Sequence, residues 1–131
     1  MPAQKHNDQS TKGFTLIEVL IAIVILSIGL LGMASLTVGI IKGNEVSNDL
    51  TMATTCAQDK VEDFQRLDYS GIPATTATDT EDYNSITGYE RYKRVTLTTV
   101  DSPAAGMKTV TVTVYWDSDA HSVELNTIFS Q

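Results

Sequence analysis

The chain has 131 residues and a formal net charge of −7 at neutral pH, with a sequence isoelectric point near 4.6. Its 9 lysine and arginine residues are scattered and outnumbered by 16 aspartate and glutamate residues, which argues against nucleic acid as a partner because phosphate binding needs a basic patch. Two histidines and one cysteine are too few for a zinc or iron–sulfur site, so we expect no metal and no other cofactor. The length suits one modest domain with an appendage.

The N-terminal part of the chain changes abruptly from polar to apolar. Residues 1–13, MPAQKHNDQSTKG, are polar and carry the basic residues Lys5 and Lys12. From Phe14 to Ile41 the only charged residue is Glu18, and a helix over this run would span roughly 42 Å, enough to cross a bilayer. A carboxylate in a membrane helix costs about 2.5–3.5 kcal/mol on insertion scales. Glu18 is therefore a candidate functional residue whose partner has to be found.

Three interpretations of this segment compete. A cleaved secretory signal needs a shorter apolar core, and Glu18 would interrupt it. A plain signal-anchor helix fits the length but gives Glu18 no role. A cut between Gly13 and Phe14 would place a new α-amino group on Phe14, one helical turn from Glu18, and this group could supply the missing counter-charge.

The third interpretation agrees with a resemblance in the residues KGFTLIE, which resemble the prepilin motif of type IV pilins and type II secretion pseudopilins. The resemblance implies that a membrane-embedded prepilin peptidase cleaves after Gly13 on the cytoplasmic face and N-methylates Phe14. Glu18 matches the glutamate that is characteristic of the motif. In an assembling bundle, the Glu18 of one subunit can meet the Phe14 amine of its neighbour, and such a buried pair would set register more than strength.

The leader lysines Lys5 and Lys12 favour a cytoplasmic N-terminus under the positive-inside rule. We therefore expect a leader at 1–13, a transmembrane and assembly helix at 14–42, and a head domain at 43–131. The helix would cross the bacterial inner membrane once, with the head in the periplasm before the subunit enters a pilus.

The head domain is predicted to be a helix packed on a small antiparallel sheet, an α+β class. The helix pattern persists over 43–67 and has an apolar stripe at steps of three and four. This stripe consists of Val46, Leu50, Ala53, Ala57, Val61 and Phe64. Residues 68–88 are turn-rich and predict a connecting loop, and 89–131 predict a β-meander with strands near 89–100, 108–116 and 122–129. The alternation of valine and threonine before Trp116 predicts that one sheet face, Trp116 included, packs on the helix stripe.

A few residues are of chemical types that could form a site. The acidic group Asp79, Glu81 and Asp82 lacks the glycine-centred spacing of a calcium loop, and we expect a solvated surface run instead. The single Cys56 excludes an intramolecular disulfide, and a small side chain at the edge of a helix face is favoured over a disulfide between chains. No nucleophile motif accompanies His6, in the leader, or His121, in a predicted turn. The sequence therefore predicts no catalytic residues.

The architecture along the whole chain resembles that of type IV pilins, and three stretches are similar to PilV-like minor pilins, the type IV pilus modification proteins. These stretches are ILSIGLLGMASL, CAQDKVEDFQRLDYSGI and VTVTVYWDSDAHSVELNTIFSQ. Ser35 stands where many major pilins have a proline, and the C-terminal cysteine pair of many major pilins is absent. The resemblance implies a low-abundance subunit that helps initiate pilus assembly in a tip complex.

The implied partners are other minor pilins, the major pilin, the prepilin peptidase and the inner-membrane assembly machinery, in a system tied to adhesion and twitching motility. Two alternatives stay open. One is a minor pseudopilin of a type II secretion system, and the other is a membrane-anchored binding protein that never polymerises.

Overall fold

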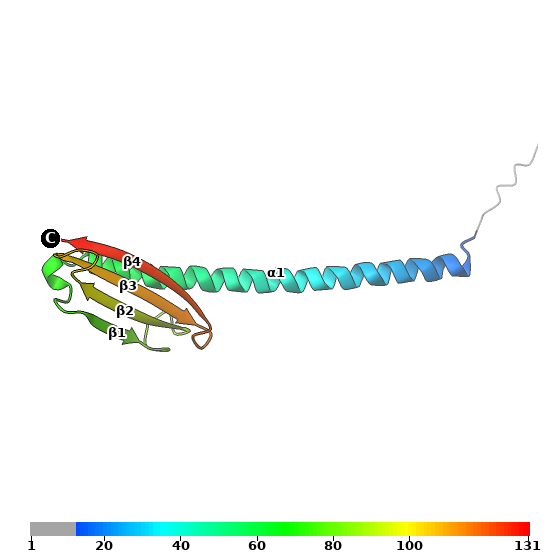
Figure 1. Cartoon of the computed structure of the whole chain (residues 1–131). Helices are drawn as coiled ribbons and strands as arrows, with labels where there is room; N and C mark the ends of the chain where they lie inside the picture. The colour runs from blue at the N-terminus through cyan, green and yellow to red at the C-terminus, as the bar shows by residue number, and fades with distance from the viewer. Residues whose placement is uncertain (1–12) are drawn as a thin grey trace, which may run out of the picture. The chain divides into compact units, whose positions relative to one another are not determined.

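The structure is a computed structural model that describes residues 13–131, so Lys5, His6 and Lys12 lie outside the described residues. The elements in chain order are α1 (Leu16–Gln65), the short 3₁₀ helix η1 (Tyr69–Gly71), β1 (Ala77–Glu81), β2 (Tyr92–Val100), β3 (Met107–Trp116) and β4 (His121–Ser130) (Figure 1). The chain forms two compact units, one ending at Lys42 and one from Gly43 to Gln131. A long N-terminal helix and a sheet packed on its later part confirm the expected α+β class.

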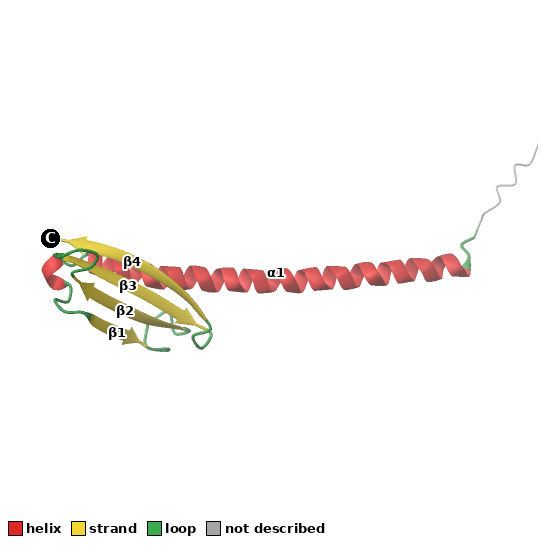
Figure 2. Ribbon diagram, viewed as in Figure 1, coloured by secondary structure: helices red, strands yellow, loops and turns green. Residues whose placement is uncertain are grey.

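The second unit contains one antiparallel sheet of four strands in the order β1-β2-β3-β4, so each strand pairs with the next along the chain (Figure 2). The meander predicted for 89–131 is confirmed, with strand bounds within three residues of those expected. In the register, Arg94 of β2 lies between Glu81 of β1 and Val114 of β3. The same register places Trp116 between Tyr92 and His121.

Alternate residues of β3 form the centre of the core. Val110, Val112 and Val114 are fully buried, whereas the intervening threonines are only half-buried, as the alternation predicted. On the helix side the core consists of small side chains, which let α1 lie close to the valines. These are Ala53, Cys56 and Ala57, all fully buried. Burying each valine is worth about 1.5–3 kcal/mol, so this contact holds the sheet on the helix.

The apolar stripe predicted for α1 is correct from Ala53 onward and wrong at its start. Val46 and Leu50 are 63% and 47% exposed, while Asp49 turns inward and is only 9% exposed. The inward turn of Asp49 is supported by the Tyr92 hydroxyl, which donates to the Asp49 carbonyl at 3.3 Å and to its Oδ1 at 3.4 Å. Helical spacing alone did not reveal this, because the stripe through Leu50 and the stripe through Asp49 both pass through Ala53.

The predicted connecting loop over 68–88 contains regular structure and needs correction. Both η1 and β1 lie within it. Four of the five β1 residues are exposed, so the sequence of the strand lacks the hydrophobic alternation from which a strand could be predicted. Lys108 of β3 fixes the start of the segment, because its Nζ donates to the carbonyl of Tyr69 at 2.9 Å and to that of Ile72 at 2.8 Å. These contacts join residues far apart in the sequence.

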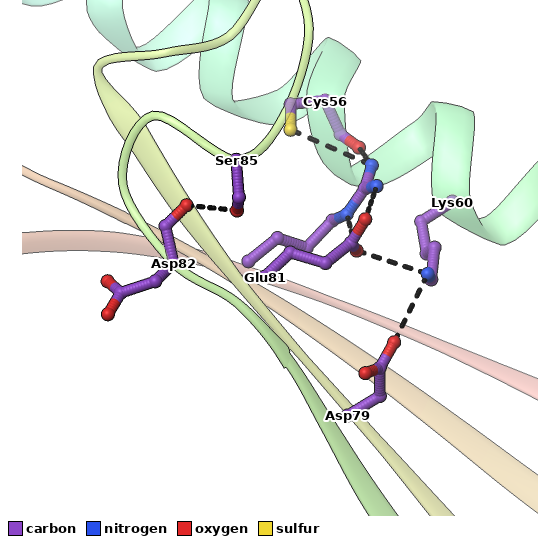
Figure 3. A network of polar contacts seen from close by, with 7 residues as sticks. Cys56, Lys60, Asp79, Glu81, Asp82 and Ser85 are labelled. Atoms are coloured by element: carbon purple, nitrogen blue, oxygen red, sulfur yellow. Dashed lines mark hydrogen bonds and ion pairs between the residues drawn. The ribbon is translucent and has the colours of Figure 1, made fainter.

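A network of charged groups joins β1 to α1. Arg94 is 8% exposed and donates from Nε and Nη2 to the two carboxylate oxygens of Glu81, at 2.7 and 2.8 Å, and from Nη1 to the carbonyl of Cys56 at 2.9 Å. Lys60 of α1 lies 3.1 Å from the Glu81 carboxylate and 3.4 Å from that of Asp79 (Figure 3). The predicted solvated acidic run is therefore wrong at Glu81, which is half-buried and bound by two basic residues.

Acidic pH should destabilise the fold, because protonation of Glu81 weakens this network. The hydrogen bonds from Arg94 lower the pKa of Glu81 from 4.5 to about 2, so the folded chain keeps the carboxylate charged where the unfolded chain binds a proton. Its contribution to stability is full above about pH 5 and is lost as the pH falls from there toward 2. The thermal unfolding midpoint of the full chain in nonionic detergent should fall over this window. Glu81→Gln should lose this component of the pH dependence, and an unchanged profile in that variant would contradict the assignment.

Two further side chains, Cys56 and Trp116, lie in the core. Cys56 is free and fully buried near the middle of the inward face of α1, not at its edge, and burial raises the pKa of its thiol. A disulfide between folded chains is therefore not available to it. Trp116 is a core residue, as predicted, and its ring stacks on that of His121 with centroids 5.6 Å apart. His121 is the first residue of β4 rather than part of the turn.

Candidate functional site

The candidate site lies at the start of α1, in the first unit. The helix begins at Leu16, two residues later than predicted, because Thr15 caps it. The Thr15 carbonyl accepts from the backbone N–H of Glu18 at 3.1 Å and of Val19 at 3.3 Å, and its Oγ1 also accepts from the Glu18 N–H at 3.3 Å. Side-chain acceptors at this position satisfy backbone donors that the first helical turn leaves unpaired. Gly13 and Phe14 thus precede the helix.

The capping role of Thr15 is not among the roles predicted above, although the sequence carries a signal for it. Thr15 and Glu18 have the spacing of a capping box, in which threonine at the cap is followed three residues later by glutamate. Glu18 also lies in the first turn, where a carboxylate interacts favourably with the positive end of the helix. Glu18 therefore has a local reason to occupy this position, in addition to the pairing with a neighbouring subunit predicted above.

The residues around the predicted cut are accessible. Phe14 is 83% exposed and Leu16 is 82% exposed. Among residues 13–131, a Cβ added to Gly13 would meet no atom beyond its chain neighbours within 4 Å. Packing within this part of the chain therefore gives no reason for glycine at this position.

The apolar segment that follows has no packing partner among residues 13–42 of its unit. Every residue from Leu16 to Ile41 is exposed, including the large side chains of leucine, isoleucine, valine and methionine. Among residues 13–131, α1 is the helix that is long and apolar enough to cross a membrane. An uninterrupted apolar surface of this size marks a contact with lipid or with other proteins. The segment is thus consistent with membrane anchoring.

The remaining residues predicted for the site are the leader lysines Lys5 and Lys12, and both fall in the part of the chain that is not described. Within residues 13–131 no three histidine, cysteine, aspartate or glutamate residues gather in a way that could hold a metal ion. The site is therefore a short linear motif of Gly13, Phe14, Thr15 and Glu18 at the exposed end of an apolar helix.

Comparison with known protein families gives one match for this motif. Residues 8–34 match the model described as the prokaryotic N-terminal methylation motif, a range that includes Gly13, Phe14 and Glu18. The match supports a type IV pilin-like protein, a class whose members serve as structural subunits, and the helix-on-sheet fold agrees with it. Comparisons with curated proteins and with solved structures yield no match.

Proposed function

We propose that this chain is a minor pilin of a type IV pilus, a structural subunit that helps initiate pilus assembly in a tip complex with other minor pilins. The observation that carries the proposal is the sequence GFTLIE at the exposed start of an apolar helix, inside the matched methylation motif. The minor-pilin role is supported by the three stretches similar to PilV-like proteins and by Ser35 in place of the proline of many major pilins.

In this proposal each site residue has a separate task. Prepilin peptidase cuts after Gly13 and methylates the new amino group of Phe14. The open space around Gly13 supports this, because a glycine that its own chain does not require is expected where an enzyme must approach the backbone. Glu18 then pairs with the Phe14 amine of a neighbouring subunit during assembly.

The same proposal assigns a place to each part of the chain. Residues 1–13 are the leader, 14–42 cross the inner membrane, and 43–131 form the periplasmic head. Support comes from the basic leader, from the exposed apolar residues of α1, and from the division of internal contacts between Lys42 and Gly43. The partners are the prepilin peptidase, the assembly machinery of the inner membrane, the major pilin and other minor pilins.

Processing tests the proposal directly. Co-expressed with prepilin peptidase, the chain should mature to a form that begins at N-methylated Phe14, as intact-protein mass spectrometry would show. Gly13→Leu should remain uncut and membrane-bound, because the added side chain obstructs the approach of the peptidase to the backbone.

Gly29→Leu is the matched control, since Gly29 also lies in open space but outside the cleavage site, and it should be processed normally. Recovery of only the full-length wild-type chain would overturn the proposal.

In the native host, loss of the gene should reduce pili and leave secretion intact. Normal pili with failed secretion would instead assign the chain to a type II secretion pseudopilus, which shares the motif.

A further inference from the structure

An underpaired carboxylate lies in the head domain, away from the processing motif. Asp49 is only 9% exposed, although a buried charge is costly unless it is well paired. Its ion pair with Arg91 joins Nη1 and Oδ1 at 3.5 Å, and the Arg91 side chain is 71% exposed. Its other contact is the long bond from the Tyr92 hydroxyl to the same Oδ1. Within residues 13–131, Oδ2 of Asp49 receives no hydrogen bond.

The other half-buried carboxylate of the head shows what full pairing looks like in this protein. Both oxygens of Glu81 accept bonds from Arg94, at 2.7 and 2.8 Å, and Lys60 lies 3.1 Å away. Asp49 has longer bonds, and they reach only one of its oxygens. Within the described residues, the second oxygen of Asp49 is therefore free to accept a bond from a further donor.

Asp49 opens into a surface cleft of about 280 Å³ between α1 and the turn that joins β3 to β4. Two further carboxylates line this cleft, Glu45 on α1 and Asp117 in the turn, and both are exposed. The cleft is also lined by Val46, Arg91, Trp116 and His121. Carboxylates outnumber guanidinium groups in this lining by three to one, and Nε2 of His121 lies 4.0 Å from the Asp117 carboxylate. The volume of the cleft is smaller than the usual range of small-molecule sites, so it suits one side chain better than a whole metabolite.

We propose that this cleft binds the guanidinium group of an arginine side chain presented by a partner protein. A guanidinium has five donors in one plane and remains charged, so it can bond to the free oxygen of Asp49 and to the rim carboxylates together. Trp116 and His121, whose rings stack on each other with centroids 5.6 Å apart, give the cleft an aromatic wall beside which a planar group can lie. This inference concerns the head alone and does not depend on cleavage or on assembly into a pilus.

Trp116 lines the cleft and is the only tryptophan of the chain, which makes its indole a specific reporter. The full chain in nonionic detergent should be titrated with N-acetyl-arginine amide while the indole N–H resonance is followed by NMR. We expect a saturable shift. N-acetyl-citrulline amide, which has nearly the same shape without the charge, should produce a shift at least tenfold smaller at the same concentration.

Variants separate the cleft from general electrostatic attraction. Asp49→Asn should weaken binding at least tenfold, and the double variant Glu45→Gln/Asp117→Asn, which changes only exposed residues, should weaken it as well. Asp63→Asn is the matched control, because Asp63 is an exposed carboxylate on the same helix outside the cleft. An equal shift with citrulline, or unchanged binding in the double variant, would overturn the proposal even if Asp49→Asn failed to fold.

Discussion

Glu18→Leu should leave membrane insertion and cleavage intact and should sharply reduce entry of the subunit into the pilus. Leucine makes the segment more apolar, so insertion is not impaired. Assembly suffers because the entering subunit no longer brings a carboxylate to the Phe14 amine of the subunit ahead of it, and that buried amine is left without a counter-charge. Removing one partner of a buried pair costs about 3–5 kcal/mol, which lowers association by roughly two to three decades. The measurements are the number of pili per cell and the recovery of the subunit with sheared pili.

The capping role of this region makes additional variants informative. Glu18→Gln keeps a side chain that suits the third position of a capping box and removes only the charge, so it should fail in assembly as Glu18→Leu does. Thr15→Ala removes the cap at a cost of about 1 kcal/mol but keeps the charge, and it should assemble nearly normally. Glu18→Asp keeps the charge with a shorter reach and should be intermediate. Normal assembly of Glu18→Gln together with failure of Thr15→Ala would show that the helix cap, and not the counter-charge, is what matters.

The position of the subunit in the fibre affects this result. A subunit at the very tip has no neighbour ahead of it, so its Glu18 is dispensable. Its Phe14 amine is still needed, because it pairs with the Glu18 of the subunit that follows. Normal piliation and normal co-recovery of Glu18→Leu would show that the carboxylate makes no assembly contact.

The features that the sequence predicted correctly are those encoded by neighbouring residues. The long helix follows from an apolar run that is continuous in the chain, and the buried face of β3 follows from the strict alternation that ends at Trp116. Gly13, Phe14 and Glu18 form a linear motif, so their proximity does not depend on folding. Even Thr15 could have been recognised, because its spacing to Glu18 is local.

The features that the sequence did not reveal depend on residues that meet only in the folded chain. β1 has one apolar residue, Ala77, and its one residue that is not exposed, Glu81, is acidic. The carboxylate of Glu81 is neutralised by Arg94 of β2 and Lys60 of α1, which lie far away in the sequence. Asp49 looks like a surface residue by its chemistry and turns inward only because Tyr92 and Arg91 are brought beside it. In both cases a charged side chain is buried or half-buried, and its charge made burial unpredictable from the sequence.

Arg94→Met should destabilise the head domain by about 3 kcal/mol, because it leaves the half-buried Glu81 without its bidentate partner. The same change removes the donor to the Cys56 carbonyl, which ties β2 to α1. Arg66→Met is the matched control. Arg66 also pairs with two carboxylates, those of Glu62 and Asp63, but its side chain is 74% exposed, so we expect a loss of about 0.5 kcal/mol or less.

Two measurements on the full chain in nonionic detergent test this prediction. Urea unfolding followed by the fluorescence of Trp116 gives the free energy of unfolding. The rate at which a thiol reagent modifies Cys56, the only cysteine and fully buried, reports opening of the contact between α1 and the sheet. Arg94→Met should raise that rate markedly and Arg66→Met should not.

The double variant Arg94→Met/Glu81→Leu should recover part of the lost stability, because an apolar pair replaces an unpaired charge. If the double variant were less stable than Arg94→Met alone, Glu81 would be held by Lys60 rather than by Arg94, and β1 would depend on its contact with α1 more than on its neighbour in the sheet.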